Sequence, residues 1–274
     1  MKILIACDME GISGVVNWEQ VTPGSPEYPR FRTLMTADVN AAIRGVFEAG
    51  ADEVLVADGH NLGNNLLIEE LDPRARLNSG TPAPFSMVQG IDSSVDGVLL
   101  VGYHAKAGTK DAILAHTWSD KCVANLWLNN KLVGETGLNA AVCACFGAPV
   151  AMISGDQTVC AEAMDLLGKI EIAAVKKTSG RMAAECLPPS VAQDKICEAA
   201  CRAVSRLVVG ENIKLFKPKI PINVRVEYRF PDMADRASLM PGVQRIDGCT
   251  IAFTCEDMTI AYRSFRASIY LARG

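Results

Sequence analysis

The chain has 274 residues, and its 27 basic and 31 acidic side chains give a net charge of −4. This balance excludes the strong basic excess of a typical nucleic-acid-binding protein. Hydrophobic residues make up 49% and charged residues 21% of the sequence, an ordinary globular composition that excludes a largely disordered or fibrous chain.

No segment has the length and apolarity of a membrane-spanning helix. The longest nearly apolar stretch, residues 140–153, is broken by Gly147 and Pro149 and falls short of the about 20 residues that such a helix needs. The apolar run before Asp8 is also too short for the core of a signal peptide. We therefore expect a cytoplasmic protein with neither a membrane nor a nucleic acid as partner.

Ten cysteines are spread along the chain without a Cys-x-x-Cys pair, and most have apolar neighbours. Cysteines in such surroundings act as small apolar residues, so we expect them to be reduced. Cys197 and Cys201 would share one helix face, but two thiolates alone rarely make a metal site.

Short apolar runs alternate with amphipathic segments in the first part of the chain. The runs are apolar on both faces, as in strands of a parallel sheet that helices cover on both sides. The expected strands are Ile3–Cys7, Val54–Ala57, Val98–Gly102 and Val150–Ile153. The expected helices are Thr36–Ala49, Glu135–Phe146 and Gln157–Leu167. This alternation predicts an α/β fold with a doubly wound, mostly parallel sheet, in a domain of residues 1–180.

The remainder of the chain, residues 181–274, has a different pattern. Its expected elements are a helix at Pro188–Val208, strands at Asn223–Tyr228 and Ile251–Cys255, and a helix at Asp257–Ala272. Asp257 is the expected N-cap of the last helix. We expect a smaller C-terminal α+β portion here, which could serve oligomerisation.

Side chains of metal-ligand type follow three of the expected strands at the point where each ends. Asp8 and Glu10 follow the first strand, His60 the second and His104 the third. One such residue alone is more often a polar cap of a turn. Because the carboxyl ends of parallel strands meet at one edge of a sheet, where ligands bind, we expect these side chains to converge. If the chain stays extended after the first strand, Asp8 and Glu10 also point to the same side.

These residue types favour a divalent metal. Imidazole together with carboxylate suits zinc, and an Asp with its two oxygens can bridge two ions in a two-metal site about 3.5–4 Å across. Glu135, flanked by glycines at the start of an expected helix, is a candidate fifth ligand. Alternatively, it is a first-turn acid that suits the helix dipole.

Six motifs in this order resemble those of the zinc D-aminopeptidases. They are Asp8-Met-Glu-Gly-Ile-Ser-Gly14, Asp58-Gly-His60, Ser86-Met-Val-Gln-Gly-Ile-Asp92, Gly102-Tyr-His-Ala105, Ala115-His-Thr117 and Gly134-Glu-Thr-Gly-Leu-Asn-Ala140. The similarity continues into the C-terminal part, through Ala173-Ala-Val-Lys176 and Met240-Pro-Gly242. One position departs from the family pattern: Ala6 stands where a Ser is usual, so a hydroxyl that could orient a ligand is absent.

The resemblance implies a zinc aminopeptidase that removes the N-terminal residue of short D-amino-acid peptides or amides, by means of a water activated by two zinc ions per subunit. It implies five metal ligands, with Asp8 as the bridge: Asp8, Glu10, His60, His104 and Glu135. It also implies that His116 is catalytic. We expect an acid–base or oxyanion role for His116, because the activated water already supplies a nucleophile. The resemblance further implies a ring-like homo-oligomer.

Two other functions remain open. The stretch Asp58-Gly-His60-Asn61 with Gly63-Asn64-Asn65 faintly resembles creatininase-type enzymes, which would cleave a cyclic or non-peptide amide. A non-catalytic peptide-binding homologue would keep the fold without bound metal. A nucleotide-binding domain is not supported, because the chain has neither the G-x-G-x-x-G nor the G-x-x-x-x-G-K-[ST] pattern.

Overall fold

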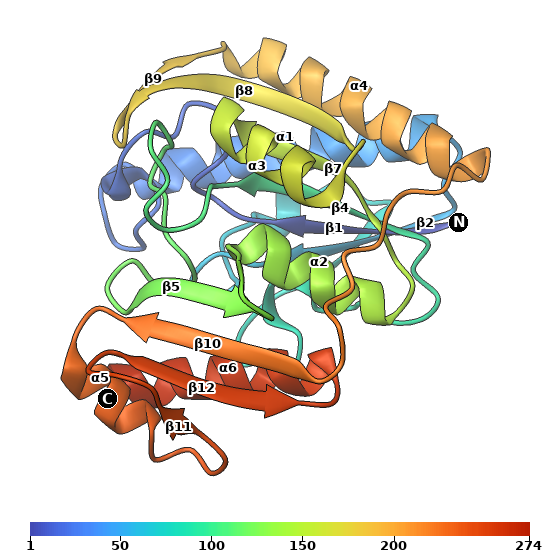
Figure 1. Ribbon diagram of the computed structural model, residues 1–274. Helices are drawn as coiled ribbons and strands as arrows, with labels where there is room; N and C mark the ends of the chain where they lie inside the picture. Colours follow the sequence, from blue (N-terminus) through green and yellow to red (C-terminus); the bar gives the residue numbers. More distant parts are fainter.

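Two sheets of different construction organise residues 1–274, all of which the computed structural model describes (Figure 1). Sheet A has seven strands in the order β3-β2-β1-β4-β7-β8-β9 and is parallel except for its antiparallel edge strand β9. Its strands are β1 (Lys2–Cys7), β2 (Glu53–Asp58), β3 (Ala75–Asn78), β4 (Gly97–Tyr103), β7 (Val150–Asp156), β8 (Glu171–Gly180) and β9 (Ala183–Cys186). The expected α/β fold with a mostly parallel sheet is confirmed.

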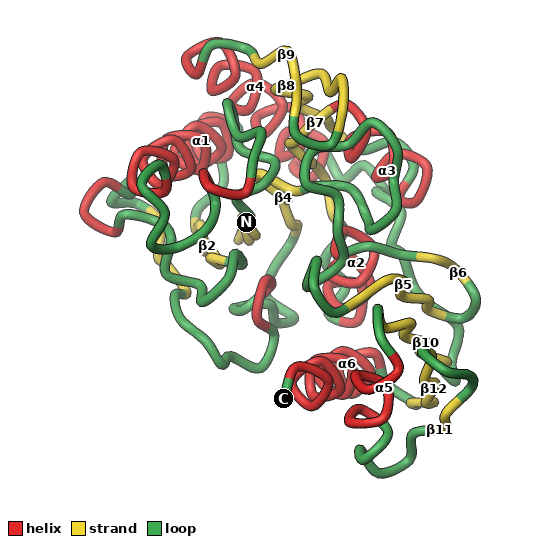
Figure 2. Tube along the Cα trace, turned by 90° about the vertical axis from the view of Figure 1, so that its left-hand side faces the viewer, coloured by secondary structure: helices red, strands yellow, loops and turns green.

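Helices cover both faces of sheet A, and Figure 2 shows α1 and α4 on one side of it and α2 and α3 on the other. These helices are α1 (Tyr28–Glu48), α2 (Glu135–Cys145), α3 (Gln157–Leu167) and α4 (Pro189–Val208). Because both faces are covered, every residue of β4 and β7 is buried, which explains why these strands lack polar–apolar alternation. Helix α1 begins earlier than expected, since Pro29 lies in its first turn, where the missing N–H costs no hydrogen bond.

Sheet B is antiparallel, with five strands in the order β11-β12-β10-β5-β6. Its strands are β5 (Val123–Leu128), β6 (Lys131–Leu132), β10 (Ile222–Tyr228), β11 (Gln244–Arg245) and β12 (Thr250–Cys255). Helices α5 (Pro231–Ala237) and α6 (Met258–Arg273) pack against it. Asp257 caps α6 as expected, because its side chain accepts hydrogen bonds from the backbone N–H groups of Thr259 and Ile260.

The division between the two sheets does not fall at residue 180. Strands β5 and β6 precede that point but belong to sheet B, whereas β9 and α4 follow it and lie with sheet A. The assignment of residues 1–180 and 181–274 to separate functional portions therefore stays a prediction. All ten cysteines are free, as expected. None of the helices is both long and apolar enough to cross a membrane.

Candidate metal centre

The carboxyl ends of β1, β2 and β4 lie side by side, and the side chains expected to converge do so there. Cys7, the last residue of β1, is in register with Asp58 of β2 and Val101 of β4. The chain turns directly after Cys7 instead of staying extended, and the N–H of Gly11 donates a 2.8 Å hydrogen bond to the carbonyl of Gly102. This hydrogen bond holds the turn that carries Asp8 and Glu10 against β4.

The close approach at this turn needs a glycine. A Cβ atom on Gly11 would lie 2.0 Å from the carbonyl oxygen of Tyr103 and 2.5 Å from the carbonyl carbon of Gly102. No side chain fits in that space without displacing the turn. The sequence Asp-Met-Glu-Gly thus places two carboxylates and the backbone contact that fixes them within four residues.

Asp8 lies between two histidines, one at each of its carboxylate oxygens. Its Oδ1 is 3.2 Å from His60 Nδ1, and its Oδ2 is 3.4 Å from His104 Nε2. Glu10 Oε2 lies 3.2 Å from the same nitrogen of His60, and Glu135 Oε1 lies 3.4 Å from the same nitrogen of His104. Two groups of ligand type therefore share Asp8, and within each group the ligand atoms lie within 4.8 Å of one another.

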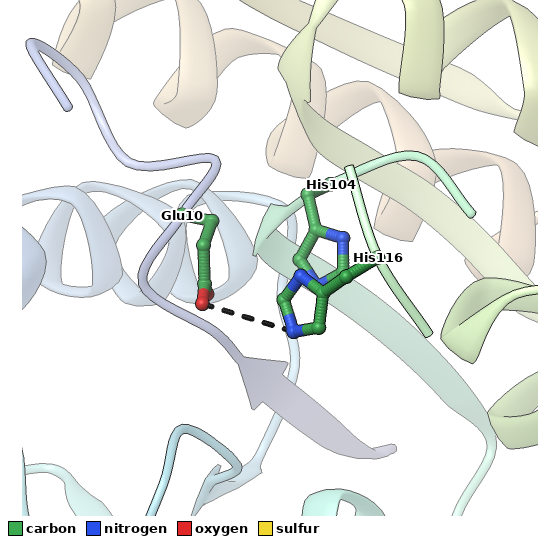
Figure 3. Close-up of side chains that lie close together, drawn as sticks. All are labelled: Glu10, His104 and His116. Atoms are coloured by element: carbon green, nitrogen blue, oxygen red, sulfur yellow. Dashed lines mark ion pairs between the residues drawn. The ribbon is translucent and has the colours of Figure 1, made fainter. Parts of the chain in front are cut away.

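His116 joins the same centre, although it comes from the irregular segment between β4 and β5. Its Nε2 lies 4.0 Å from Glu10 Oε1 and 3.9 Å from Glu135 Oε1. Figure 3 shows its ring stacked on that of His104, with 4.0 Å between the ring centroids, and pointing toward Glu10. The ring of Trp18 contacts that of His116 edge to face, with 5.5 Å between the ring centroids.

Each histidine uses one ring nitrogen for a backbone carbonyl, which turns the other nitrogen toward the centre. His60 Nε2 donates to Val21 O at 2.7 Å, His104 Nδ1 to Ala105 O at 3.0 Å and His116 Nδ1 to Leu114 O at 2.9 Å, the three contacts that fix the ring orientations. A neutral imidazole held in this way presents a lone pair on its second nitrogen. This is the usual outer hydrogen bond of a metal-ligating histidine.

The charges of the centre are buried and depend on one another. Burial acts to raise the pKa of Asp8, but the hydrogen bonds and charges of His104 and His60 outweigh it and lower that pKa well below its usual value. Burial acts to lower the pKa of His60 and of His104, but the neighbouring carboxylates outweigh it and raise both well above the usual value. The carboxylates therefore require positive charge beside them, from protonated imidazoles or from a cation.

Two buried atoms of the centre, Glu10 Oε2 and His104 Nε2, make no well-aligned hydrogen bond in the protein, although each lies 3.2–3.4 Å from a group that can carry the opposite charge. Burying such atoms unpaired is costly. A divalent cation at this position would bind both, and carboxylate and imidazole are the ligand types it requires. The residues present therefore fit a metal centre.

The centre opens into a cavity of about 520 Å³. Glu135, the first residue of α2, accepts a 2.6 Å hydrogen bond from the N–H of Trp118, which also lines the cavity. Glu135 is therefore directed to the centre and held there by a loop residue, and a helix-dipole role alone does not describe it.

Two residues of the surroundings were missed by the sequence analysis as functional candidates. Lys176, within β8, is buried, and its ammonium group contacts the turn that carries Glu10. The sequence feature that could have identified Lys176 is a lysine at the end of the otherwise apolar run Ala-Ala-Val-Lys. Arg266 of α6 lines the cavity, and no local pattern distinguishes it from the other arginines of that helix.

A doubly wound sheet with buried carboxylates and imidazoles at its carboxyl edge defines an α/β enzyme of metal-dependent type. The family model described as D-aminopeptidase, peptidase family M55, matches residues 1–267. The chain therefore belongs to the D-aminopeptidase family, which confirms the resemblance of the motifs and the expectation of an aminopeptidase.

Individual members of the family are similar to this chain over nearly its full length. A D-aminopeptidase from Bacillus subtilis (strain 168) is 37% identical over 273 residues, which cover 99% of this chain and 98% of the relative. The solved structure of the Zn-dependent D-aminopeptidase DppA from Bacillus subtilis, described as a self-compartmentalizing protease, superposes with a TM-score of 0.95. That match covers 100% of this chain and 98% of DppA at 37% identity.

Proposed function

We propose that the protein is a zinc-dependent aminopeptidase that removes the N-terminal residue from short peptides or amides containing D-amino acids. The observation that carries the proposal is the buried cluster of carboxylates and imidazoles, in which the ligand atoms Glu10 Oε2 and His104 Nε2 make no well-aligned hydrogen bond within the protein. The zinc dependence of the Bacillus subtilis protein supports the choice of metal, and the family supports the choice of substrate.

Five residues would hold two zinc ions. Asp8 would bridge them, with Glu10 and His60 on one side and His104 and Glu135 on the other, in accord with the two groups that share Asp8. A bound pair of zinc ions supplies an activated water as nucleophile and polarises the scissile carbonyl. The carboxylates of the centre also provide negative charge for the free α-amine of the substrate.

His116 would move the proton. With Nδ1 donating to Leu114 O, its Nε2 is free to accept a proton from the attacking water and, once protonated, to return it to the leaving amine or to donate a hydrogen bond to the oxyanion. Its stacking on His104 and its contact with Trp18 fix the ring beside the place where the scissile bond would lie.

We also propose a ring-like homo-oligomer, because the Bacillus subtilis relative is described as self-compartmentalizing. The smaller C-terminal portion offers apolar surface for such contacts, since Phe230 and Leu239 are 57% and 76% exposed. A cytoplasmic location belongs to the same proposal and rests on the sequence alone.

A hydrolysis panel tests the function. It compares D- and L-aminoacyl amides, D- and L-dipeptides and creatinine, each with and without a chelator. We expect cleavage of the D-substrates, loss of activity with the chelator, recovery with added zinc and about two zinc ions per chain. Cleavage of creatinine alone would instead support a creatininase-type amidohydrolase. Less than one zinc per chain together with no hydrolysis would support a non-catalytic homologue.

A further inference from the structure

The cavity beside the centre is lined by groups of both charges. The carboxylates of Asp8, Glu10 and Glu135 belong to the centre, whereas helix α6 contributes Arg266 and Arg273 to the lining. Lys121 and Asp120, which also line the cavity, offset each other's charge. A zwitterionic ligand, with an amine at one end and a carboxylate at the other, matches this distribution.

Arg266 is the buried cation of this lining. It is 6% exposed, and its guanidinium lies against the rings of Trp118 and Tyr262, at 5.9 and 5.8 Å from their centroids. Its Nη1 donates hydrogen bonds to the carbonyls of Ala83 and Pro84, at 2.5 and 2.9 Å. These contacts hold the guanidinium plane in one orientation.

The opposite edge of the Arg266 guanidinium has no acceptor in the protein. Its Nε is buried without a hydrogen-bond partner, and its Nη2 makes no hydrogen bond either. The N–H groups of Nε and Nη2 are parallel and form the edge that binds both oxygens of a carboxylate. The side chain is thus fixed through Nη1, and its Nε–Nη2 edge is left without an acceptor in a residue that lines the substrate cavity.

Trp118 connects this edge to the centre. Its backbone N–H is bonded to Glu135, and its ring contacts Arg266. Trp118, Glu135 and Arg266 thus form a contiguous part of the cavity lining. In an extended dipeptide the amine and the carboxylate lie at most about 7 Å apart.

We propose that Arg266 binds the C-terminal carboxylate of a dipeptide substrate whose N-terminal amine lies at the carboxylates of the centre. This inference rests on the proposed aminopeptidase function and adds a subsite that selects for a free carboxylate two residues from the amine. The subsite favours dipeptides over their amides because a buried, charge-assisted hydrogen-bond pair forms only with the acid.

The test uses two substrates that differ only in the carboxylate, D-alanyl-D-alanine and D-alanyl-D-alanine amide. We expect Arg266→Gln to lower the ratio of kcat/KM for the acid to that for the amide by roughly 10-fold to 100-fold, mainly through the KM for the acid. Arg266→Lys keeps the charge without the fork, so it should lower the ratio by a smaller factor. Arg263→Gln, on the exposed face of α6, is the matched control and should leave the ratio unchanged.

The outcomes separate this subsite from the proposed function. An Arg266→Gln protein that loses the same factor on both substrates, so that the ratio is unchanged, would show that Arg266 only supports the loop at Ala83 and would overturn the inference. Wild-type protein that cleaves neither substrate in the presence of zinc would contradict the aminopeptidase function itself, and the subsite with it. Far-ultraviolet circular dichroism of each variant shows whether it is folded.

Discussion

The ammonium group of Lys176 donates a 2.7 Å hydrogen bond to the backbone carbonyl of Glu10, 166 residues away in the sequence. It donates two more, to the carbonyls of Ile12 at 2.9 Å and Val15 at 2.7 Å. All three donors of a buried cation thus hold the turn that carries two candidate metal ligands. Asp38 of α1 holds the same turn from another side, accepting from the N–H and the hydroxyl of Ser13.

Replacing this lysine should loosen the centre. Lys176→Met keeps the length of the side chain but leaves three carbonyl groups without their donor and removes a cation that lies near Asp38 and Asp156. We expect the free energy of unfolding to fall by roughly 2–4 kcal/mol and the zinc affinity to fall about 10-fold or more. Chelator competition and denaturant titration measure the two quantities. Lys177→Met, at the exposed neighbouring position, should change neither, and equal losses in the two variants would contradict the assignment.

The positions of Asp8, His60 and His104 could be predicted from the sequence because each follows a strand of a parallel sheet. Residues that directly follow the strands of a parallel sheet lie close together, since all the strands end at one edge. His116 and Lys176 follow no such rule. His116 lies in a segment without regular structure and is placed by its packing on Trp18 and His104, and Lys176 is defined by partners far away in the sequence.

Strand pairing sets a second limit on what the sequence predicts. Residues 123–132 form β5 and β6, which belong to sheet B, and β5 pairs with β10 across about 100 residues of chain, as in the pair Trp127 with Arg225. The local pattern of β5 does not identify its partner strand, because any half-buried strand has the same pattern. The boundary expected at residue 180 marks a change of local pattern and not the division between the sheets.

The contact between Gly11 and β4 should be as important for zinc binding as the ligands themselves. Gly11→Ala adds a methyl group where the carbonyl oxygen of Tyr103 lies 2.0 Å away, so the turn must move and Asp8 and Glu10 move with it. We expect a loss of stability of roughly 2 kcal/mol or more, together with less bound zinc. Gly248→Ala is the control, because nothing lies within 4 Å of a Cβ atom there. Thermal unfolding and metal analysis compare the two, and full zinc content in Gly11→Ala would exclude this role.

A pair of histidine variants should separate a ligand from a proton-transfer residue. His104→Ala removes a nitrogen shared by two carboxylates and should lower the zinc content. His116 lies within ligand distance of Glu10 and His104 but is not one of the five proposed ligands. His116→Ala should therefore retain zinc but should lose on the order of 10²–10⁴ in kcat with a smaller change in KM. The measurements are zinc per chain and steady-state kinetics for both proteins. Zinc loss in His116→Ala would make His116 a ligand, and an unchanged kcat would leave it without a catalytic role.

Asp38 should make the stability of the fold depend on pH. Burial raises the pKa of Asp38 from 3.8 to about 6, although hydrogen bonds from Ser13 act in the opposite direction. Between these two values the folded protein holds a proton that the unfolded chain releases. The contribution of Asp38 to stability is therefore complete below about pH 4 and is lost as the pH rises through about 6, by up to roughly 3 kcal/mol.

The variant Asp38→Asn cannot titrate at this position. The unfolding free energy of the wild type minus that of the variant should therefore fall across this window and stay constant above it. Denaturant titrations of both proteins measure this difference. A chelator is present throughout, so that the metal-ligand residues titrate alike in both proteins and their contributions cancel. A difference that stays constant from pH 4 to pH 7 would show that Asp38 does not titrate in this range.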